Sequence, residues 1–191
     1  TERDLSMKVV VGITLGSMLP IGMLMWLFLK DTGVANHAWG LVLVSILFIL
    51  ITGLAVASVC GYMAGLIGSS NSPISGVGIL AALAAAVLVK AVASSASGDE
   101  TGALVAYTLF TSAVVFSIAS ISNDNLQDLK TGQLVDSTPW KQQVALIIGV
   151  VFGAIVIPPV LSLMQTAFGF AGAPGAGENA LAAPQASLIS S

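Results

Sequence analysis

The sequence predicts an all-α membrane protein with about five transmembrane helices, some of them broken or re-entrant, that form part of a larger helical bundle. Hydrophobic residues make up 56% of the 191 residues and charged residues only 8%, against roughly 25% charged residues in a soluble domain. Five apolar segments approach the roughly 20 residues that a helix needs to cross a bilayer. The few charged residues lie at the ends of these segments, as expected where lipid surrounds the middle.

The predicted spans follow one another over residues 1–168, which we interpret as a membrane domain portion. The first span contains Pro20, which predicts a kink. The second is longer than a minimal crossing, which predicts a tilt or a protruding end. The third is short, rich in Ala and Gly, and follows a polar stretch, which is typical of a half-helix entered from a broken midpoint. The spans cover residues 7–29, 40–66, 76–93, 103–121 and 143–164.

The end of the chain has a different composition. Pro158-Pro159 is expected to interrupt the hydrogen-bond ladder near the end of the fifth span. Residues 169–191 are rich in Gly, Ala and Pro, and we predict an irregular segment there. The chain starts at Thr1, ends at Ser191 and has an odd number of predicted spans. We therefore expect an excerpt from a longer polypeptide, with a processed start as the alternative.

Small residues recur at helical spacing on two of the predicted spans. Gly53, Ala57, Gly61 and Gly65 follow one another every four residues, and residues 149 and 153 repeat the pattern on the fifth span. Such a stripe lets another helix approach closely. We expect packing inside one large bundle, with homodimerisation as the less favoured alternative.

Composition also excludes several classes of function. The net charge is -3 and no basic stripe is present, which disfavours nucleic-acid binding. Cys60 is the single cysteine and His37 the single histidine, so the chain offers neither a disulfide framework nor a metal cluster, and we predict no cofactor. The motifs of intramembrane proteases are missing, since the only Gly-Asp pair, Gly98-Asp99, lies in a predicted connection. The sequence therefore does not indicate an enzyme.

Positive charge gives a weak indication of orientation. With five crossings and a cytoplasmic amino end, four basic residues lie on the cytoplasmic side and two on the opposite side. Because cytoplasmic loops are enriched in Lys and Arg, we expect the amino end in the cytoplasm. Re-entrant segments would break this simple alternation.

The first polar element is the break at residues 68–76, between the second and third spans. Ser72 is a preferred N-cap type and Pro73 suits the first helical position, which leaves free amide groups at a helix start. Transporters aim such amides at a substrate carboxylate, while unwound carbonyls hold a cation or proton donor. Asn71 and Ser75 add side-chain hydrogen-bonding groups next to Gly76. The alternative is an ordinary surface loop that caps a helix.

The second polar element covers residues 123–132 and precedes a helix restart at Thr138-Pro139. If it is helical, Asp124 and Asp128 lie one turn apart on one face, and this repulsion favours a bound proton or cation. Lys130 lies two residues beyond Asp128, and Gly132 is typical of a helix stop. The alternative is a solvated loop. The polar side chains that accompany the two aspartates are Asn123, Asn125 and Gln127.

At these two elements the sequence resembles the oligopeptide transporter family, in particular its yellow-stripe-like and bacterial branch. Residues 71–76 read Asn-Ser-Pro-Ile-Ser-Gly and resemble the family's Asn-x-Pro-x-Ser-Gly element. Residues 126–132 resemble its Gln-Asp-x-Lys-Thr-Gly element, and residues 138–143 resemble the continuation. Residues 1–5 and 181–186 also resemble family segments, so the resemblance extends over nearly the whole chain.

The resemblance implies a secondary active transporter in the cell membrane that couples protons to the import of oligopeptides or metal chelates. Its partners would be the bilayer, a small substrate, protons and the remaining spans of the same transporter. We expect Asp124 or Asp128 to take part in proton coupling, with Lys130 neutralising it. The expected substrate-binding residues are Asn71, Ser72, Pro73, Ser75, Gly76, Asn123, Asn125 and Gln127.

Two other classes of function stay open. A passive channel can also use small-residue helices and broken segments to line a pore. A structural membrane subunit without transport activity would tolerate substitution of the polar breaks. Saturable, pH-dependent uptake favours the carrier over both.

Overall fold

A computed structural model of the chain describes residues 4–94, 100–171, 177 and 180–182. Five helices in it are long and apolar enough to cross a membrane, which confirms the predicted all-α membrane class. Two short 3₁₀ turns, η1 and η2, flank the second helix. The elements in chain order are α1 Met7–Lys30, η1 Ala35–His37, α2 Ala38–Ile67, η2 Ser69–Asn71, α3 Ile74–Val92, α4 Glu100–Leu134 and α5 Pro139–Phe168.

The chain divides into two compact units, Thr1–Trp140 and Lys141–Ser191, which we describe separately. The first unit contains α1 to α4, and the second consists mainly of α5. Most of the predicted irregular segment 169–191 lies outside the described residues. Its described part includes a single parallel bridge between Phe170 and Leu181.

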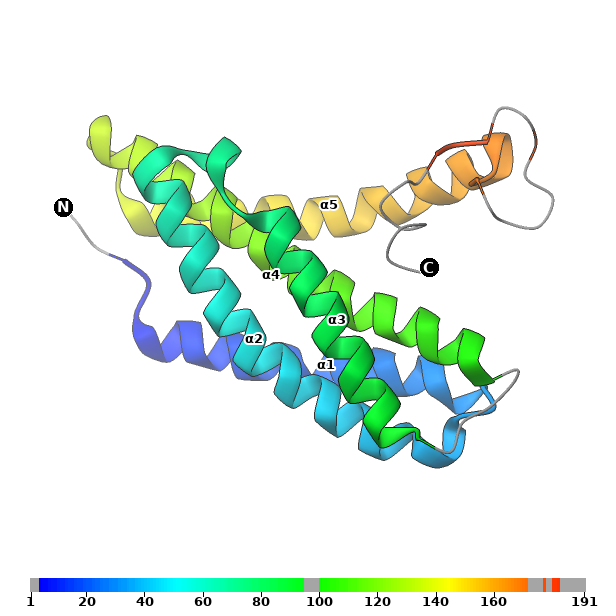
Figure 1. Ribbon diagram of the computed structural model, residues 1–191. Helices are drawn as coiled ribbons and strands as arrows, with labels where there is room; N and C mark the ends of the chain where they lie inside the picture. The colour runs from blue at the N-terminus through cyan, green and yellow to red at the C-terminus, as the bar shows by residue number, and fades with distance from the viewer. Residues whose placement is uncertain (1–3, 95–99, 172–176, 178–179, 183–191) are drawn as a thin grey trace. The chain divides into compact units, whose positions relative to one another are not determined.

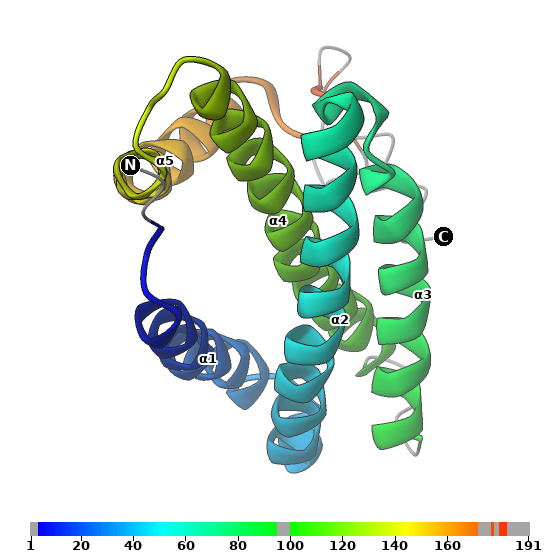
Figure 2. The same cartoon turned by 90° about the vertical axis from the view of Figure 1, so that its left-hand side faces the viewer.

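Helix α2 is the centre of the first unit. It lies side by side with α3, with which it forms an antiparallel hairpin, and α4 runs parallel to it (Figures 1 and 2). A Cβ atom at Gly53 would lie 2.9 Å from Ile118 Cδ1, and one at Gly61 would lie 2.8 Å from Ser122 Oγ. Real Cβ atoms do not make such contacts, so α4 packs directly on the backbone of α2. The structure thus shows the close approach that the small-residue stripe predicts, except at Gly65, where nothing lies within 4 Å.

Helix α3 meets α4 at a second close approach, which the sequence analysis missed. Gly78 is buried, and a Cβ atom there would overlap the ring of Phe116. A single glycine opposite one aromatic residue has no periodic pattern, and therefore gives no signal in the sequence. The missing side chain of Gly78 leaves room for the ring of Phe116 between α3 and α4.

Helix α1 is attached to the unit through its second half. Its buried residues are Gly22, Met25 and Leu29, whereas most of the large side chains of its first half are exposed. Figure 2 shows α1 diverging from α2 and α4 toward its amino end. Pro20 lies inside a helix that continues to Lys30. The first half of α1 is thus available to lipid or to further helices.

A polar contact lies in the middle of this otherwise apolar packing. Tyr107 of α4 is fully buried, and its hydroxyl donates a hydrogen bond to Ser45 Oγ of α2 at 3.0 Å. The same hydroxyl lies 3.7 Å from Met25 Sδ of α1, and the ring of Phe28 lies 6.4 Å from the ring of Tyr107. One phenol group therefore contacts both α1 and α2.

Helix α5 differs from the other four because none of its described residues is buried. Pro158 and Pro159 lie inside it, and the helix continues to Phe168. The two prolines lack the amide donors of the hydrogen-bond ladder, as predicted, but the helix does not end there. Large apolar side chains such as Phe152, Ile155 and Leu163 are more than 60% exposed, which suits a helix surrounded by lipid or by other spans.

Candidate functional site

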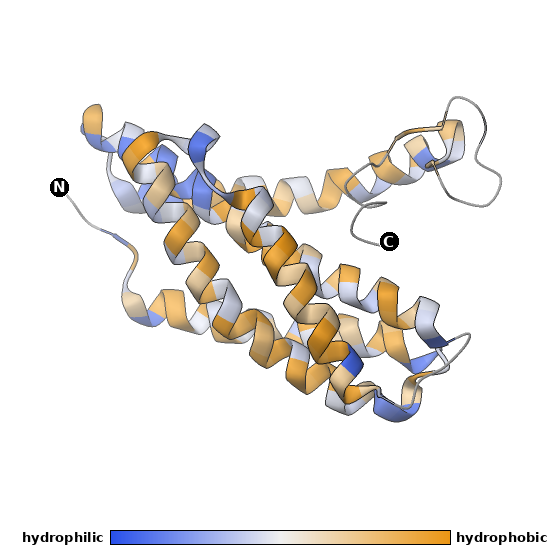
Figure 3. Cartoon of the chain, in the orientation of Figure 1, coloured by the Kyte–Doolittle hydropathy of each residue, from blue (hydrophilic) through white to orange (hydrophobic). Residues whose placement is uncertain are grey.

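The two polar elements of the sequence lie together at one end of the first unit. Figure 3 shows the hydrophilic residues of α4 and of the α2–α3 connection gathered there, with apolar residues along the rest of these helices. The backbone amide of Ser69 donates a hydrogen bond to Gln127 Oε1 at 3.2 Å, across 58 residues of sequence. Each element was identifiable in the sequence, but their contact depends on the parallel packing of α2 and α4 and could not be read from either motif.

The break between α2 and α3 is a short, ordered turn. Gly68 ends α2 with φ +89°, a left-handed conformation that favours glycine. Ser72 Oγ donates a hydrogen bond to the Cys60 carbonyl at 3.2 Å, and Asn71 Nδ2 donates to the Ile67 carbonyl at 3.4 Å. These bonds fold the break back against the last turns of α2. Both bonds are longer than the usual 2.9 to 3.0 Å, which is typical of weak contacts.

The start of α3 differs from the prediction in two respects. The N-cap position is Pro73 and not Ser72, and no side chain caps the helix. Ser72 instead bonds to Cys60, and its carbonyl accepts the amide of Ile74 at 2.9 Å. With 19 residues, α3 is roughly 28 Å long and forms a whole candidate span. The break therefore lies between two complete helices and not at the midpoint of one.

The polar residues at the start of α3 are accessible. Asn71, Pro73, Ser75 and Gly76 are exposed, while Ser72 is half-buried. Ser75 and Gly76 belong to the first turn of α3, where amide groups lack partners within the helix. The break thus presents backbone and side-chain polar groups at the polar end of the unit.

The second polar element is helical throughout, so the alternative of a solvated loop is wrong for residues 123–134. Helix α4 continues through it to Leu134. Asp124 and Asp128 are exposed and lie one turn apart, as predicted for a helix. Lys130 Nζ donates a hydrogen bond to Gln133 Oε1 at 3.0 Å, so the structure gives this amine a partner on its own helix. Asn125 is half-buried and Gln127 is exposed.

Helix α4 ends two residues after Gly132, the predicted stop. The Gly132 carbonyl accepts the amide of Ser137 at 2.8 Å, and Asp136 has φ 56°. This six-residue bond around a left-handed residue is a Schellman turn, with Asp136 in the place that glycine usually takes. Gly132 therefore belongs to the terminating turn, while Asp136 makes the left-handed step.

Asn123 is the buried member of the second element. Its exposed fraction is 3%, and its Oδ1 atom has no hydrogen-bond partner in the structure. A buried acceptor without a donor costs about 1 to 3 kcal/mol. Asn123 lies on the buried face of α4 that also contains Val115 and Ala119. The sequence identified this residue as polar, but its burial follows from the helix packing.

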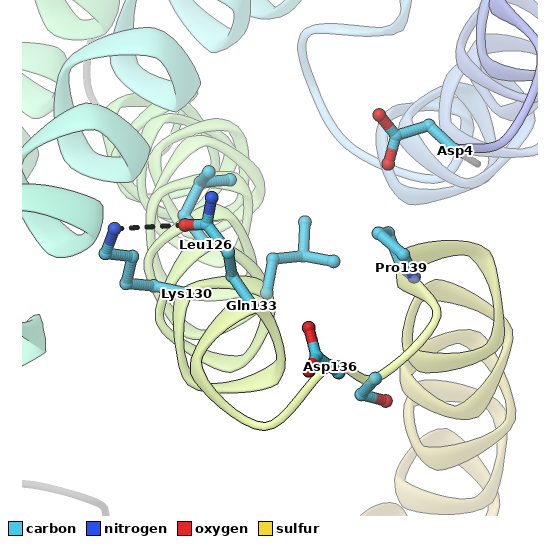
Figure 4. Close-up of a pocket in the computed structure, with 8 residues that line it drawn as sticks. Asp4, Leu126, Lys130, Gln133, Asp136 and Pro139 are labelled. Carbon is cyan, nitrogen blue, oxygen red and sulfur yellow. Dashed lines mark hydrogen bonds between the residues drawn. The ribbon is translucent and has the colours of Figure 1, made fainter. Parts of the chain in front are cut away.

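A cavity of about 380 Å³ lies at the same end of the first unit, at the C-terminal end of α4 (Figure 4). Leu126 and Leu129 form its apolar wall. Two carboxylates reach it from separate segments, Asp4 from the residues before α1 and Asp136 from the turn after α4. The other lining residues are Lys130, Gln133, Ser137 and Pro139. Within the described part of the chain, no group of three His, Cys, Asp or Glu side chains is placed to hold a metal ion.

These features define the class of protein. It is a multi-pass helical membrane protein in which the polar groups of α4 and of the α2–α3 connection lie together at one end of the first unit. The chain belongs to the oligopeptide transporter family, since the family model described as "OPT oligopeptide transporter protein" matches residues 1–191. It is also similar to a protein of Haemophilus influenzae named "Putative oligopeptide transporter". The two are 42% identical over 197 residues, which cover 98% of this chain and 31% of that relative. No solved structure matches the chain.

Proposed function

We propose that this chain is part of a secondary active transporter of the cell membrane that imports oligopeptides or metal chelates together with protons. The family and the name of the Haemophilus influenzae relative support transport of peptides. The observation that carries the proposal is the hydrogen bond between Ser69 and Gln127. It joins the two polar elements at one end of an apolar helix unit, so hydrogen-bonding groups from both elements lie together there.

In this proposal the break between α2 and α3 and the polar end of α4 bind the substrate. Asn71, Ser75 and Gly76 are exposed at the start of α3, which suits a carboxylate because a helix start carries partial positive charge. Asn123, Asn125 and Gln127 supply amide groups from α4. Ser72, Pro73 and Gly76 shape the turn that presents these groups.

Proton coupling is assigned to the exposed carboxylates of α4. Asp124 and Asp128 lie one turn apart, where two like charges destabilise each other and uptake of a proton by either one relieves the repulsion. Lys130 lies two residues beyond Asp128 on the same helix and also lines the cavity. In this proposal its positive charge offsets the negative charge of the coupling aspartate.

The proposal is tested with the full-length transporter in proteoliposomes. We expect saturable accumulation of a labelled tripeptide or a labelled metal chelate, driven by an inward proton gradient. Replacing Asn71 with Leu is expected to raise the substrate concentration for half-maximal uptake several-fold. The matched control is Asn36→Leu, since Asn36 is also an exposed Asn in a 3₁₀ turn but lies between α1 and α2.

The outcomes separate the rival functions. Uptake that rises linearly with substrate and ignores the proton gradient supports a passive channel. No uptake of either substrate class supports a structural subunit. Equal half-saturation for wild type and Asn71→Leu would show that the break only caps α3. Transport without chemical change of the substrate agrees with the absence of protease motifs in the sequence.

A further inference from the structure

The unpartnered acceptor of Asn123 cannot be satisfied by a helix that packs on the outside of the unit. The residue is 3% exposed, and its Oδ1 atom is inaccessible to solvent in the described structure. A donor must therefore come from a small group that enters the packing, or the packing must open.

Helix register places Asn123 beside the break. One residue earlier, Ser122 Oγ donates to the Ala57 carbonyl of α2 at 2.7 Å, and one turn later Gln127 Oε1 accepts the amide of Ser69. On the other side, α3 runs antiparallel to α4 and meets Phe116 at Gly78. Asn123 lies seven residues after Phe116, about two turns or roughly 10 Å further along α4. Because α3 runs in the opposite direction, the same distance from Gly78 leads back beyond the start of α3 and into the break.

The break is the part of this packing that can move. Between its ends it is held by the Ser69–Gln127 bond at 3.2 Å, the Ser72–Cys60 bond at 3.2 Å and two bonds of Asn71 at 3.4 Å, which lie at or beyond the long end of the usual range. Its two ends are held more closely, since the Gly68 amide donates to the Ala64 carbonyl at 3.0 Å and the Ile74 amide to the Ser72 carbonyl at 2.9 Å. Displacing the turn breaks a few weak bonds and leaves the apolar packing of α2 on α4 intact. Because helix register places this turn beside Asn123, the opening is assigned to the turn.

The electrostatic surroundings select the kind of donor. The carboxyl end of α2, at Ile67, lies at the break and carries the partial negative charge of a helix C-terminus. Asp124 adjoins Asn123 in sequence, and Asp128 lies one turn further along α4. The basic residue of this part of α4, Lys130, is bonded to Gln133. The start of α3, at the other side of the break, carries partial positive charge that suits the substrate's carboxylate, whereas the carboxylates of α4 favour a cationic donor over a neutral one beside Asn123.

We propose that Asn123 Oδ1 accepts a hydrogen bond from a primary ammonium group of the substrate, such as a peptide amino terminus, when the break at residues 68–73 swings aside. This inference rests on the proposed transport function and adds the recognised chemical group. In the empty protein the turn closes over an unsatisfied acceptor, which destabilises the closed state. The incoming ammonium removes that penalty, so binding itself favours the open turn.

The test uses the full-length protein, a labelled tripeptide and its des-amino analogue, in which hydrogen replaces the terminal amino group. Wild type is expected to half-saturate with the tripeptide at a concentration about ten-fold below that for the analogue, since a hydrogen bond to a charged group is lost. In Asn123→Leu, of similar volume but without the acceptor, this ratio is expected to fall close to one. The control Asn36→Leu is expected to keep the wild-type ratio.

Thermal unfolding of the same variants in detergent separates recognition from structure. Because Leu removes an unsatisfied buried acceptor, Asn123→Leu is expected to melt at or above the wild-type temperature. A lower melting temperature with an unchanged tripeptide-to-analogue ratio would overturn the inference and show that Asn123 has a stabilising partner in the folded protein. An unchanged ratio alone would also overturn it.

Failure of the proposed function gives a different pattern. If wild type accumulates no tripeptide, the transport proposal fails, and ligand-induced shifts of the melting temperature then test the site. A larger shift with the tripeptide than with the analogue, absent in Asn123→Leu, would uphold the ammonium site without transport. No shift with either compound would overturn the site as well.

Discussion

The hydroxyl of Tyr107 and Ser45 Oγ lie 3.0 Å apart in the middle of the first unit, where both residues are buried. The hydroxyl also lies 3.7 Å from Met25 Sδ, so this one group links α4 to α2 and contacts α1. Buried hydrogen bonds between membrane helices contribute on average about 0.6 kcal/mol and at most about 1.7 kcal/mol. The contact therefore fixes the register of three helices more than it stabilises them.

Tyr107→Phe is expected to lower the free energy of unfolding by about 0.5 to 1.7 kcal/mol, because it removes the hydrogen bond and leaves the Ser45 hydroxyl without it. Thermal unfolding of the full-length protein in detergent measures the change. Ser45→Ala should cost a similar amount, and the double variant should cost little more than either. Additive losses would contradict a direct bond between the two hydroxyls.

Gly78→Ala is expected to destabilise the protein by about 1 to 3 kcal/mol, since the new Cβ overlaps the ring of Phe116 and forces α3 away from α4. Adding Phe116→Leu should recover part of this loss by removing the ring. Gly65→Ala is the matched control, because nothing lies within 4 Å of that position. It should be neutral or stabilising, as alanine favours a helix over glycine. Equal effects at the two glycines would argue against the close approach of α3 and α4.

Gln127→Met keeps the length of the side chain but removes the acceptor for the Ser69 amide. We expect a loss of about 0.5 to 1.5 kcal/mol in the free energy of unfolding and a change in the half-saturation of uptake, because the break loses its contact with α4. Circular dichroism melts and proteoliposome uptake measure the two effects. Unfolding and uptake identical to wild type would show that this bond does not hold the break.

Asp128→Asn is expected to reduce uptake driven by a proton gradient by ten-fold or more, while uptake by exchange at equal pH on both sides is largely retained. The amide cannot bind and release a proton at this position. Asp31→Asn, at the opposite end of the first unit, is the control for removing one exposed carboxylate. Gradient-driven uptake that survives in Asp128→Asn but not in Asp124→Asn would move the coupling role to Asp124.

The fold class was predictable because it rests on bulk properties. Long apolar segments with few charges leave a helix in lipid as the available structure, and five such helices are present. The stripe of Gly53 and Gly61 also predicted a close helix contact, since four-residue spacing places small residues on one face. What the stripe could not show was its partner, because α4 and its neighbours have similar hydrophobicity on all sides.

The two polar elements of the candidate site could be predicted separately, but their contact with each other could not. Ser72 has the chemistry of an N-cap, yet in the structure its hydroxyl bonds to the Cys60 carbonyl, a contact set by how α2 ends and turns. The burial of Asn123 depends on which face of α4 meets α2 and α3. Local propensity carries no information on such long-range contacts, so this part of the site required the structure.

The parallel packing of α2 and α4 has a consequence for how the protein is made. The Ala57 carbonyl meets the hydroxyl of Ser122, which is synthesised 65 residues later. At a synthesis rate of roughly 5 to 20 residues per second, the face of α2 that contains Gly53 and Gly61 exists for roughly 3 to 13 seconds before α4, which packs on it, has been made. During nascent-chain insertion this face of α2 is therefore covered by other neighbours, such as lipid, which have to leave before α4 can dock.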